Sequence, residues 1–116
     1  MNTRTITRAE LQAMFQPPAP PTTDELDALR RLIEVAKSDT GQSRRVADFL
    51  LAWWNAGSCG GFDLTTLWGV DHAIAADMVA VFGLVARVGE YPPRLDPAFD
   101  AEFRAIVRAW RPELAD

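Results

Sequence analysis

Apolar residues recur every three or four positions along most of this chain, and this spacing limits what it can fold into. The pattern is clear over residues 22–38, 42–56, 72–87 and 96–111, with a shorter stretch over 63–69. One face of an α-helix has this spacing, whereas a half-buried strand alternates apolar and polar residues. No strand-like alternation, heptad run or internal repeat is found. The sequence therefore predicts an all-α protein, a compact single-domain bundle of about five helices.

A short helical leader precedes the bundle. Thr7 and Glu10 have the spacing of a capping box, in which both side chains accept hydrogen bonds from backbone amides at a helix start. Three apolar residues then share one side of the expected helix: Leu11, Met14 and Phe15. Prolines at four of the six positions in 16–21 end it and favour an extended linker. We divide the chain into a leader, residues 1–21, and a helical domain, residues 22–116.

The leader has two interpretations. It is either a loose segment or a mobile arm that docks through Phe15. We expect the loose segment.

Capping residues set the expected ends of the helices. The residues expected at helix starts are Thr22 with Glu25, Asp63, Asp71, and Asp96 with Pro97. Gly57 has the usual position of a residue that ends a helix, so residues 58–61 are expected to form a tight loop.

The segment from His72 to about Arg87 is the most apolar of the expected helices. Asp77 is its only charged residue between Ala73 and Ala86. The expected buried face consists of Ile74, Met78, Val81, Phe82 and Val85. We therefore expect this helix to form the core of the domain.

Cysteine content and apolar segments indicate the cellular compartment. Cys59 is the only cysteine, so no internal disulfide can form, as is usual in a reducing compartment. Residues 1–7 lack the apolar segment of a secretory signal, and the apolar run from Ala73 to Ala86 is shorter than the ~20 residues that span a bilayer. We expect a cytoplasmic protein.

The net charge of −4 argues against a general nucleic-acid-binding protein, which is normally basic. It also falls short of the charge density of a dedicated DNA mimic. Eleven of the twelve basic residues are arginine, which suits ion pairs within the fold or reflects a G+C-rich genome.

Candidate catalytic and metal-binding residues are few. Cys59 and His72 are the only members of their kinds, and a nucleophilic pair between them is a remote alternative. A metal site would require both to converge with Asp63 and Asp71, which are better explained as helix caps. We predict no catalytic residue, no metal site and no cofactor.

Two further motifs give weak signals. The segment Ser58–Gly61 lacks the lysine and the preceding strand of a phosphate-binding loop. The short helix, Gly69–Asp71 and the helix that follows resemble a helix-turn-helix in outline. However, the second helix has few polar side chains that could contact bases.

The tryptophans suggest a binding face. Trp53 and Trp110 lie on apolar stripes and are expected in the core, whereas Trp54 and Trp68 flank the glycine-rich loop. Aromatic residues beside polar groups are typical of binding hot spots, although core packing remains the alternative for each. The predicted partner-binding residues are Trp54, Asn55, Ser58, Cys59, Gly60, Gly61, Phe62, Asp63 and Trp68.

Asp77 needs a partner because an isolated carboxylate in an apolar helix is unfavourable. We expect a structural ion pair with Arg44 or Arg45, with Arg87 as a further candidate. A functional acid with a raised pKa is the alternative.

Two unusual strings support a family resemblance. The segments Gln42–Ala47 and Trp53–Gly61 resemble those of a family of unknown function that recurs on integrative and conjugative elements and plasmids of proteobacteria. The resemblance covers about Leu26 to Leu114 and leaves the leader outside. It implies accessory cargo of mobile DNA, and it brings no catalytic residues.

These observations lead to one preferred function and two alternatives. The preferred one is a non-enzymatic protein-binding accessory protein of a bacterial mobile element, by analogy an inhibitor of host defence of the anti-CRISPR kind. The second is a DNA- or conjugation-associated regulator, which requires a clustered basic face built from Arg30, Arg31, Arg104, Arg108 and Arg111. The third is a small enzyme that uses Cys59 and His72.

Overall fold

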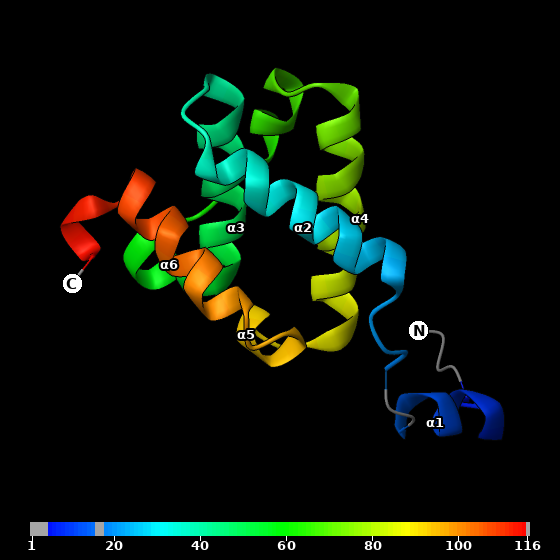
Figure 1. The fold of residues 1–116 in the computed structure, drawn as a ribbon. Helices are drawn as coiled ribbons and strands as arrows, with labels where there is room; N and C mark the ends of the chain where they lie inside the picture. Colours follow the sequence, from blue (N-terminus) through cyan, green and yellow to red (C-terminus); the bar gives the residue numbers. More distant parts are fainter. Residues whose placement is uncertain (1–4, 16–17, 116) are drawn as a thin grey trace.

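The computed structural model describes residues 5–15 and 18–115 and confirms the all-α prediction, since none of these residues lies in a strand (Figure 1). The elements are α1 (Arg8–Phe15), α2 (Thr23–Lys37), α3 (Gly41–Cys59), the 3-10 helix η1 (Leu64–Gly69), α4 (His72–Val88), α5 (Pro92–Leu95), α6 (Phe99–Trp110) and the 3-10 helix η2 (Pro112–Leu114). Gln16 and Pro17 of the expected linker, with residues 1–4 and 116, lie outside the described part.

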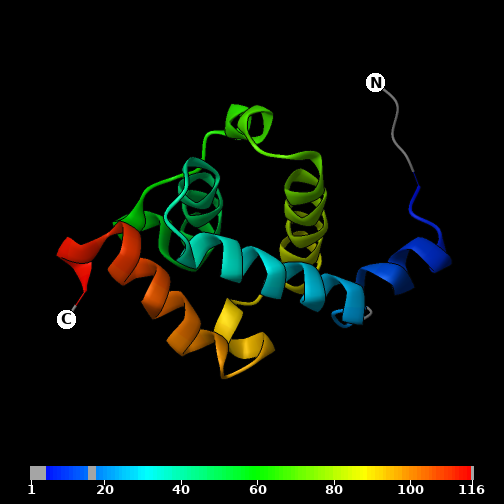
Figure 2. The ribbon, with the colours of Figure 1, turned by 45° about the horizontal axis from the view of Figure 1, so that its top comes forward.

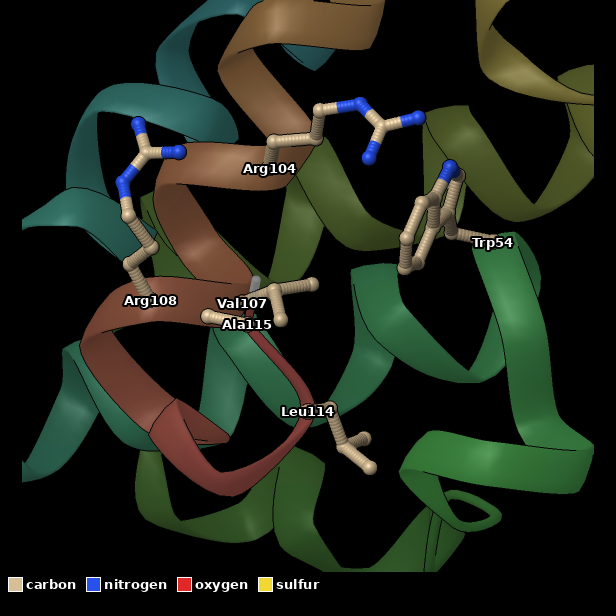
Figure 3. A pocket seen from close by; sticks show the side chains of 6 residues that line it. All are labelled: Trp54, Arg104, Val107, Arg108, Leu114 and Ala115. Atoms are coloured by element: carbon tan, nitrogen blue, oxygen red, sulfur yellow. The ribbon is translucent and has the colours of Figure 1, made fainter.

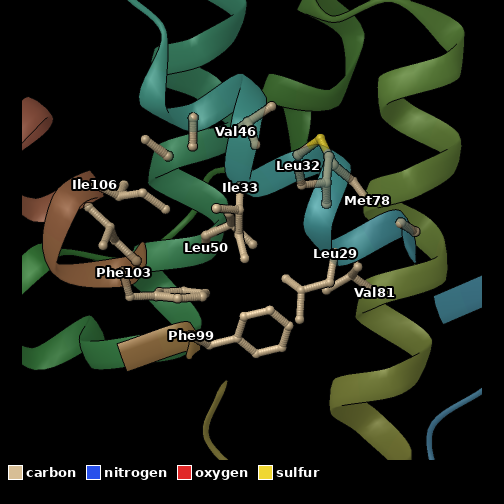
Figure 4. Close-up of a cluster of buried hydrophobic side chains, with 14 of the residues drawn as sticks. Leu29, Leu32, Ile33, Val46, Leu50, Met78, Val81, Phe99, Phe103 and Ile106 are labelled. Atoms are coloured by element: carbon tan, nitrogen blue, oxygen red, sulfur yellow. The ribbon is translucent and has the colours of Figure 1, made fainter. Parts of the chain in front are cut away.

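Helix α2 is the centre of the bundle. It packs against α3, α4 and α6, and α3 and α4 stand side by side against it (Figure 2). Five of its residues are buried: Ala28, Leu29, Leu32, Ile33 and Ala36. They meet the buried side chains of α6 and α3, among them Phe99, Phe103, Ile106, Val46 and Leu50 (Figure 4).

The prediction that the helix starting at His72 forms the core is right only in part. Helix α4 buries Met78, Val81 and Leu84, whereas Phe82 is 61% exposed and Val79 is 64% exposed. The reason is position, because α4 packs mainly against α2 and makes few contacts with α3. A helix with one principal neighbour buries one face, however apolar the other face is.

The start of α2 has the predicted capping box. The Thr22 hydroxyl accepts a hydrogen bond from the Glu25 backbone amide (3.1 Å), and Glu25 Oε1 accepts one from the Thr22 amide (2.9 Å). Glu25 also accepts from the Arg87 guanidinium at the end of α4, with Nη1 to Oε2 at 2.8 Å. The same guanidinium donates to the carbonyls of Ala19 and Pro20, at 2.9 and 3.1 Å. Arg87 therefore fixes the linker beside the last turn of α4.

We expect acid to weaken this joint between α2 and α4. The hydrogen bond from Arg87 lowers the pKa of Glu25 from 4.5 to about 2, with help from the Thr22 backbone amide. A carboxyl group whose pKa is lower in the folded state stabilises that state above its unfolded pKa. The contribution is therefore present above pH 4.5 and is lost as the pH falls from 4.5 towards about 2. The urea midpoint of the native protein should fall more over this range than that of Glu25→Gln. Parallel curves for the two proteins would contradict the linkage.

The predicted end of α3 is wrong by three residues. Asn55 interrupts the helix with φ −164° and ψ 78°, and the helix continues through Ser58 and Cys59. The side-chain oxygen of Asn55 accepts a hydrogen bond from the Ser58 amide at 3.2 Å and so supports the turn after the kink. Gly60, at φ +100°, ends the helix in place of Gly57. Ser58 and Cys59 are thus helical, and only Gly60 and Gly61 belong to the loop.

Two other helix starts differ from expectation. The Asp71 side chain makes no cap and instead accepts a hydrogen bond from the Gln42 amide group at 3.1 Å. Helix α6 starts at Phe99, because Asp96 accepts a bond from the Ala98 amide in a turn that includes Pro97.

Within residues 5–15 and 18–115, no helix combines the length and apolar character needed to cross a membrane.

Candidate functional site: an apolar groove between α3, η1 and α4

An apolar groove lies between α3 and α4 and extends to η1. The 3-10 helix η1 lies in the connection between α3 and α4, at one end of the two helices (Figure 2). It consists of two overlapping cavities of about 240 and 190 Å³. Every described residue that lines it is apolar. They are Phe49, Ala52, Trp53, Phe62, Leu64, Leu67, Met78, Val79, Phe82 and Val85. We call this set of ten residues the groove.

The rim of the groove is exposed. Leu64 of η1 and the α4 residues Val79 and Phe82 are each more than 60% exposed. Trp68, which is outside the lining but on the same 3-10 helix, is 85% exposed. Large apolar side chains gathered on one face of a soluble protein commonly mark a surface for another molecule.

Aromatic contacts build the α3 side of the groove. The Phe49 ring meets the edge of the Phe62 ring, with centroids 5.2 Å apart and planes at 72°. Trp53 lies one turn further along α3, and its indole N–H donates to the Glu90 carbonyl at 3.1 Å. Both rings are therefore held in place by partners outside their own helix.

Short polar contacts hold η1 in place. Asp63 Oδ1 accepts hydrogen bonds from the amide and the hydroxyl of Thr65, at 2.9 and 2.8 Å, which lowers the pKa of Asp63. This confirms the predicted cap. At the other end of η1, Arg45 Nη1 donates to the Gly69 carbonyl at 3.1 Å. Gln42 also accepts a bond from the Asp71 amide at 2.6 Å, so α3 holds the short segment between η1 and α4 at two points.

The Arg45 side chain packs closely against Gly69. A Cβ atom added there would lie 2.8 Å from Arg45 Nε and 2.9 Å from its Cζ. We expect Gly69→Ala to displace the guanidinium, break its hydrogen bond and lower the free energy of unfolding by about 1 kcal/mol in urea denaturation.

Gly61→Ala is the matched control, since an added Cβ there meets nothing within 4 Å. The destabilisation by Gly69→Ala should also disappear in an Arg45→Ala background, because the clash is then absent. A full effect without the Arg45 side chain would show that the cost comes from the backbone.

A second cavity, of about 180 Å³, lies on another side of α3 (Figure 3). It is lined by Trp54, Arg104, Val107, Arg108, Leu114 and Ala115. Arg104 also donates to Asp100 at 3.0 Å, one turn earlier on α6. The cavity combines one aromatic ring with charged groups, in contrast to the fully apolar groove.

The structure separates the predicted partner-binding residues. Phe62 lines the groove, Asp63 caps η1, and Trp68 projects from η1. Trp54 lines the second cavity instead. The remaining members, Asn55, Ser58, Cys59, Gly60 and Gly61, form the end of α3 and its turn, where all except Cys59 are exposed.

Sequence reasoning missed Phe49, Leu64, Val79 and Phe82 as residues of one site. A signal was present in α4, where apolar residues occupy more than one side of the helix and Asp77 is the only charge over fourteen positions. That pattern indicates a second surface to be covered, and we interpreted it as deep burial.

The predicted pairing of Asp77 with Arg44, Arg45 or Arg87 is wrong. Its partner is Arg31 of α2, whose Nε and Nη2 donate to the two carboxylate oxygens at 2.9 Å each. This arrangement follows from the packing of α2 on α4, which brings together residues that are 46 positions apart.

The arginines proposed for a basic face are largely paired with acids. Arg31 contacts Asp77, Arg30 contacts Asp27 and Asp96, and Arg104 contacts Asp100. Arg111 is half-buried and donates to Asp48 at 2.8 Å and to the Cys59 carbonyl at 3.0 Å. These carboxylates offset the positive charge that a nucleic-acid surface needs.

Cys59 is 5% exposed, and burial raises the pKa of its thiol. A raised pKa lowers the thiolate fraction, which is the reactive form. His72 lies at the exposed first turn of α4. In the described part of the chain, no three His, Cys, Asp or Glu residues are grouped so that they could hold a metal ion.

Comparison with known proteins adds the family. No curated protein and no solved structure matches the chain. The family of unknown function DUF7673 matches residues 26–111, which include α3, η1 and α4 and therefore the whole groove, but exclude the leader. The chain belongs to this family of unknown function, DUF7673.

Proposed function

We propose that this protein is a non-enzymatic protein-binding module and that the groove receives the apolar face of an amphipathic helix from a partner protein. The observation that carries the proposal is the groove itself, with ten apolar lining residues and an exposed rim on α4 and η1. Grooves of this kind receive apolar side chains spaced three and four residues apart on a helix.

The chemistry of the groove favours a protein over a small molecule. Small-molecule sites combine an apolar lining with a few polar groups that orient the ligand, and they usually enclose about 300–1,000 Å³. The two cavities here, of about 240 and 190 Å³, together reach only the low end of that range, and the described lining is apolar throughout, with no polar group to orient a ligand. Each has room for one or two side chains of a partner.

The biological setting is the second part of the proposal. The resemblance to proteins of proteobacterial mobile elements supports an accessory role in the bacterial cytoplasm, with inhibition of a host defence system as the specific form. The acidic balance of the chain, −4 overall, and the paired arginines speak for a protein partner over DNA.

A charge placed on the rim tests the groove. We expect Phe82→Asp to reduce recovery of the partner at least about tenfold, because a carboxylate would be buried against apolar groups. The measurement is affinity capture of the tagged protein from its bacterial host at low and high salt, with quantitative mass spectrometry and nucleic-acid staining. Ala101→Asp is the matched control, since it adds the same charge at an exposed position of α6.

The outcomes are distinct. A protein that survives high salt with the native chain and with Ala101→Asp, but is lost with Phe82→Asp, supports the groove. Equal recovery with both variants contradicts it. Nucleic acid that is released by salt would favour the regulator that acts on DNA.

A further inference from the structure

Helix α1 has an apolar stripe that nothing in its own neighbourhood covers. Leu11, Met14 and Phe15 lie on one side of the helix and are 47%, 66% and 80% exposed. None of the residues Arg8–Phe15 is buried, and α1 projects beyond the start of α2 (Figures 1 and 2). A short amphipathic helix gains most of its stability from packing of its apolar face.

Helix α4 has a bare outer face of matching size. Ala76, Val79, Phe82, Gly83 and Ala86 are all exposed and follow one another at helical spacing. A Cβ atom added at Gly83 would meet nothing within 4 Å, so the space above this face is open. Small residues beside larger apolar ones allow a second helix to approach closely. From Val79 to Ala86 this face extends about 10 Å along the helix axis, and the eight residues of α1 extend about 12 Å.

The linker between α1 and α2 is held on the same side of α4 as this outer face. Arg87 lies one helical turn after Gly83 and holds the carbonyls of Ala19 and Pro20. Phe15 is four residues before Ala19, so its Cα can lie at most about 14 Å from that anchor. Phe82 is only about 8 Å before Arg87 along the helix axis. The apolar stripe of α1 is therefore within reach of the outer face of α4 in the same chain.

We propose that α1 folds back onto α4 of its own chain, with Leu11, Met14 and Phe15 packed along the outer face between Val79 and Ala86. In this arrangement the two helices run parallel. The linker that follows the C-terminal end of α1 is held at the C-terminal end of α4, so the two C-terminal ends lie together. The leader then covers Val79 and Phe82, two residues of the groove rim. The proposal concerns the free protein and does not depend on the partner of the groove.

Docking should also make the molecule more compact. The Cα radius of gyration with α1 projecting is 16.7 Å, whereas about 13 Å is typical for a compact domain of this length. Part of this difference disappears when α1 lies along α4.

A pair of cysteines tests the contact. In a Cys59→Ser background, Met14→Cys with Gly83→Cys places two thiols on the facing sides of α1 and α4. Gln12→Cys with Gly83→Cys is the matched control, because Gln12 has a nearly equal tether length and its side chain leaves α1 about 160° around the helix axis from that of Met14. The rate of disulfide formation in the full-length chain is measured under mild oxidation at two protein concentrations.

We expect the Met14 pair to close at least about tenfold faster than the Gln12 pair, as a monomer and independently of concentration, because a disulfide requires Cα atoms within about 7 Å. Equal rates for the two pairs would overturn the proposal. Disulfide-linked dimers that increase with concentration would also overturn it, since the docking would then be between two copies. Urea denaturation of each reduced variant shows whether the bundle is folded before the rates are compared.

Discussion

Replacing Leu32 with alanine is expected to lower the free energy of unfolding by about 2–5 kcal/mol. Leu32 lies at the centre of α2 and is completely buried (Figure 4). The substitution removes three carbon atoms from the place where α2 meets the rest of the core, and a helix backbone cannot close such a cavity fully. Urea denaturation followed by circular dichroism measures the loss.

Phe82→Ala is the control for this prediction. Its side chain is larger than that of Leu32, but it is 61% exposed on α4. We therefore expect a loss below about 1 kcal/mol. If Phe82→Ala destabilised the protein as much as Leu32→Ala, the outer face of α4 would contribute as much to stability as the buried face of α2.

The second large effect is expected at Phe103 of α6. Its ring is completely buried and meets Trp53 of α3 edge to face, with centroids 6.2 Å apart and planes at 90°. Phe103→Ala should cost about 3–5 kcal/mol, the upper part of the range for buried positions. It should also weaken the α3 side of the groove, because Trp53 lines the groove on its other side.

Phe103→Leu separates volume from ring geometry. It retains most of the volume, so we expect a loss of roughly 1–1.5 kcal/mol. A double-mutant cycle with Trp53→Leu should give a coupling of about 0.5–1.5 kcal/mol for the ring pair. A coupling near zero would show that the two rings contribute only through the area they bury.

The class of fold was predictable because helical periodicity and capping are local. Thr22 with Glu25 and Asp63 with Thr65 each form their hydrogen bonds within three residues, and the structure contains both. Which helix is most deeply buried was not predictable. Composition favoured α4 over α2, but burial depends on how many neighbours a helix has, and only the packing determines that.

The groove shows the same limit. Phe62 and Trp68 were selected from the sequence because they are aromatic and flank a glycine-rich loop. Phe49 and Phe82, which line the groove together with Phe62, are 33 positions apart. They lie close together because α3 and α4 both pack against α2. The end of α3 was misplaced because the kink at Asn55 needs a single unusual backbone conformation, which no periodic pattern indicates.

The position of Cys59 provides a built-in reporter for the protein in solution. Its thiol is enclosed in the core at the end of α3, and its carbonyl is tied to Arg111 at the end of α6. A thiol reagent can react with it fully only when this corner of the core opens. The modification rate of the native chain therefore measures how often this corner opens, without any added label.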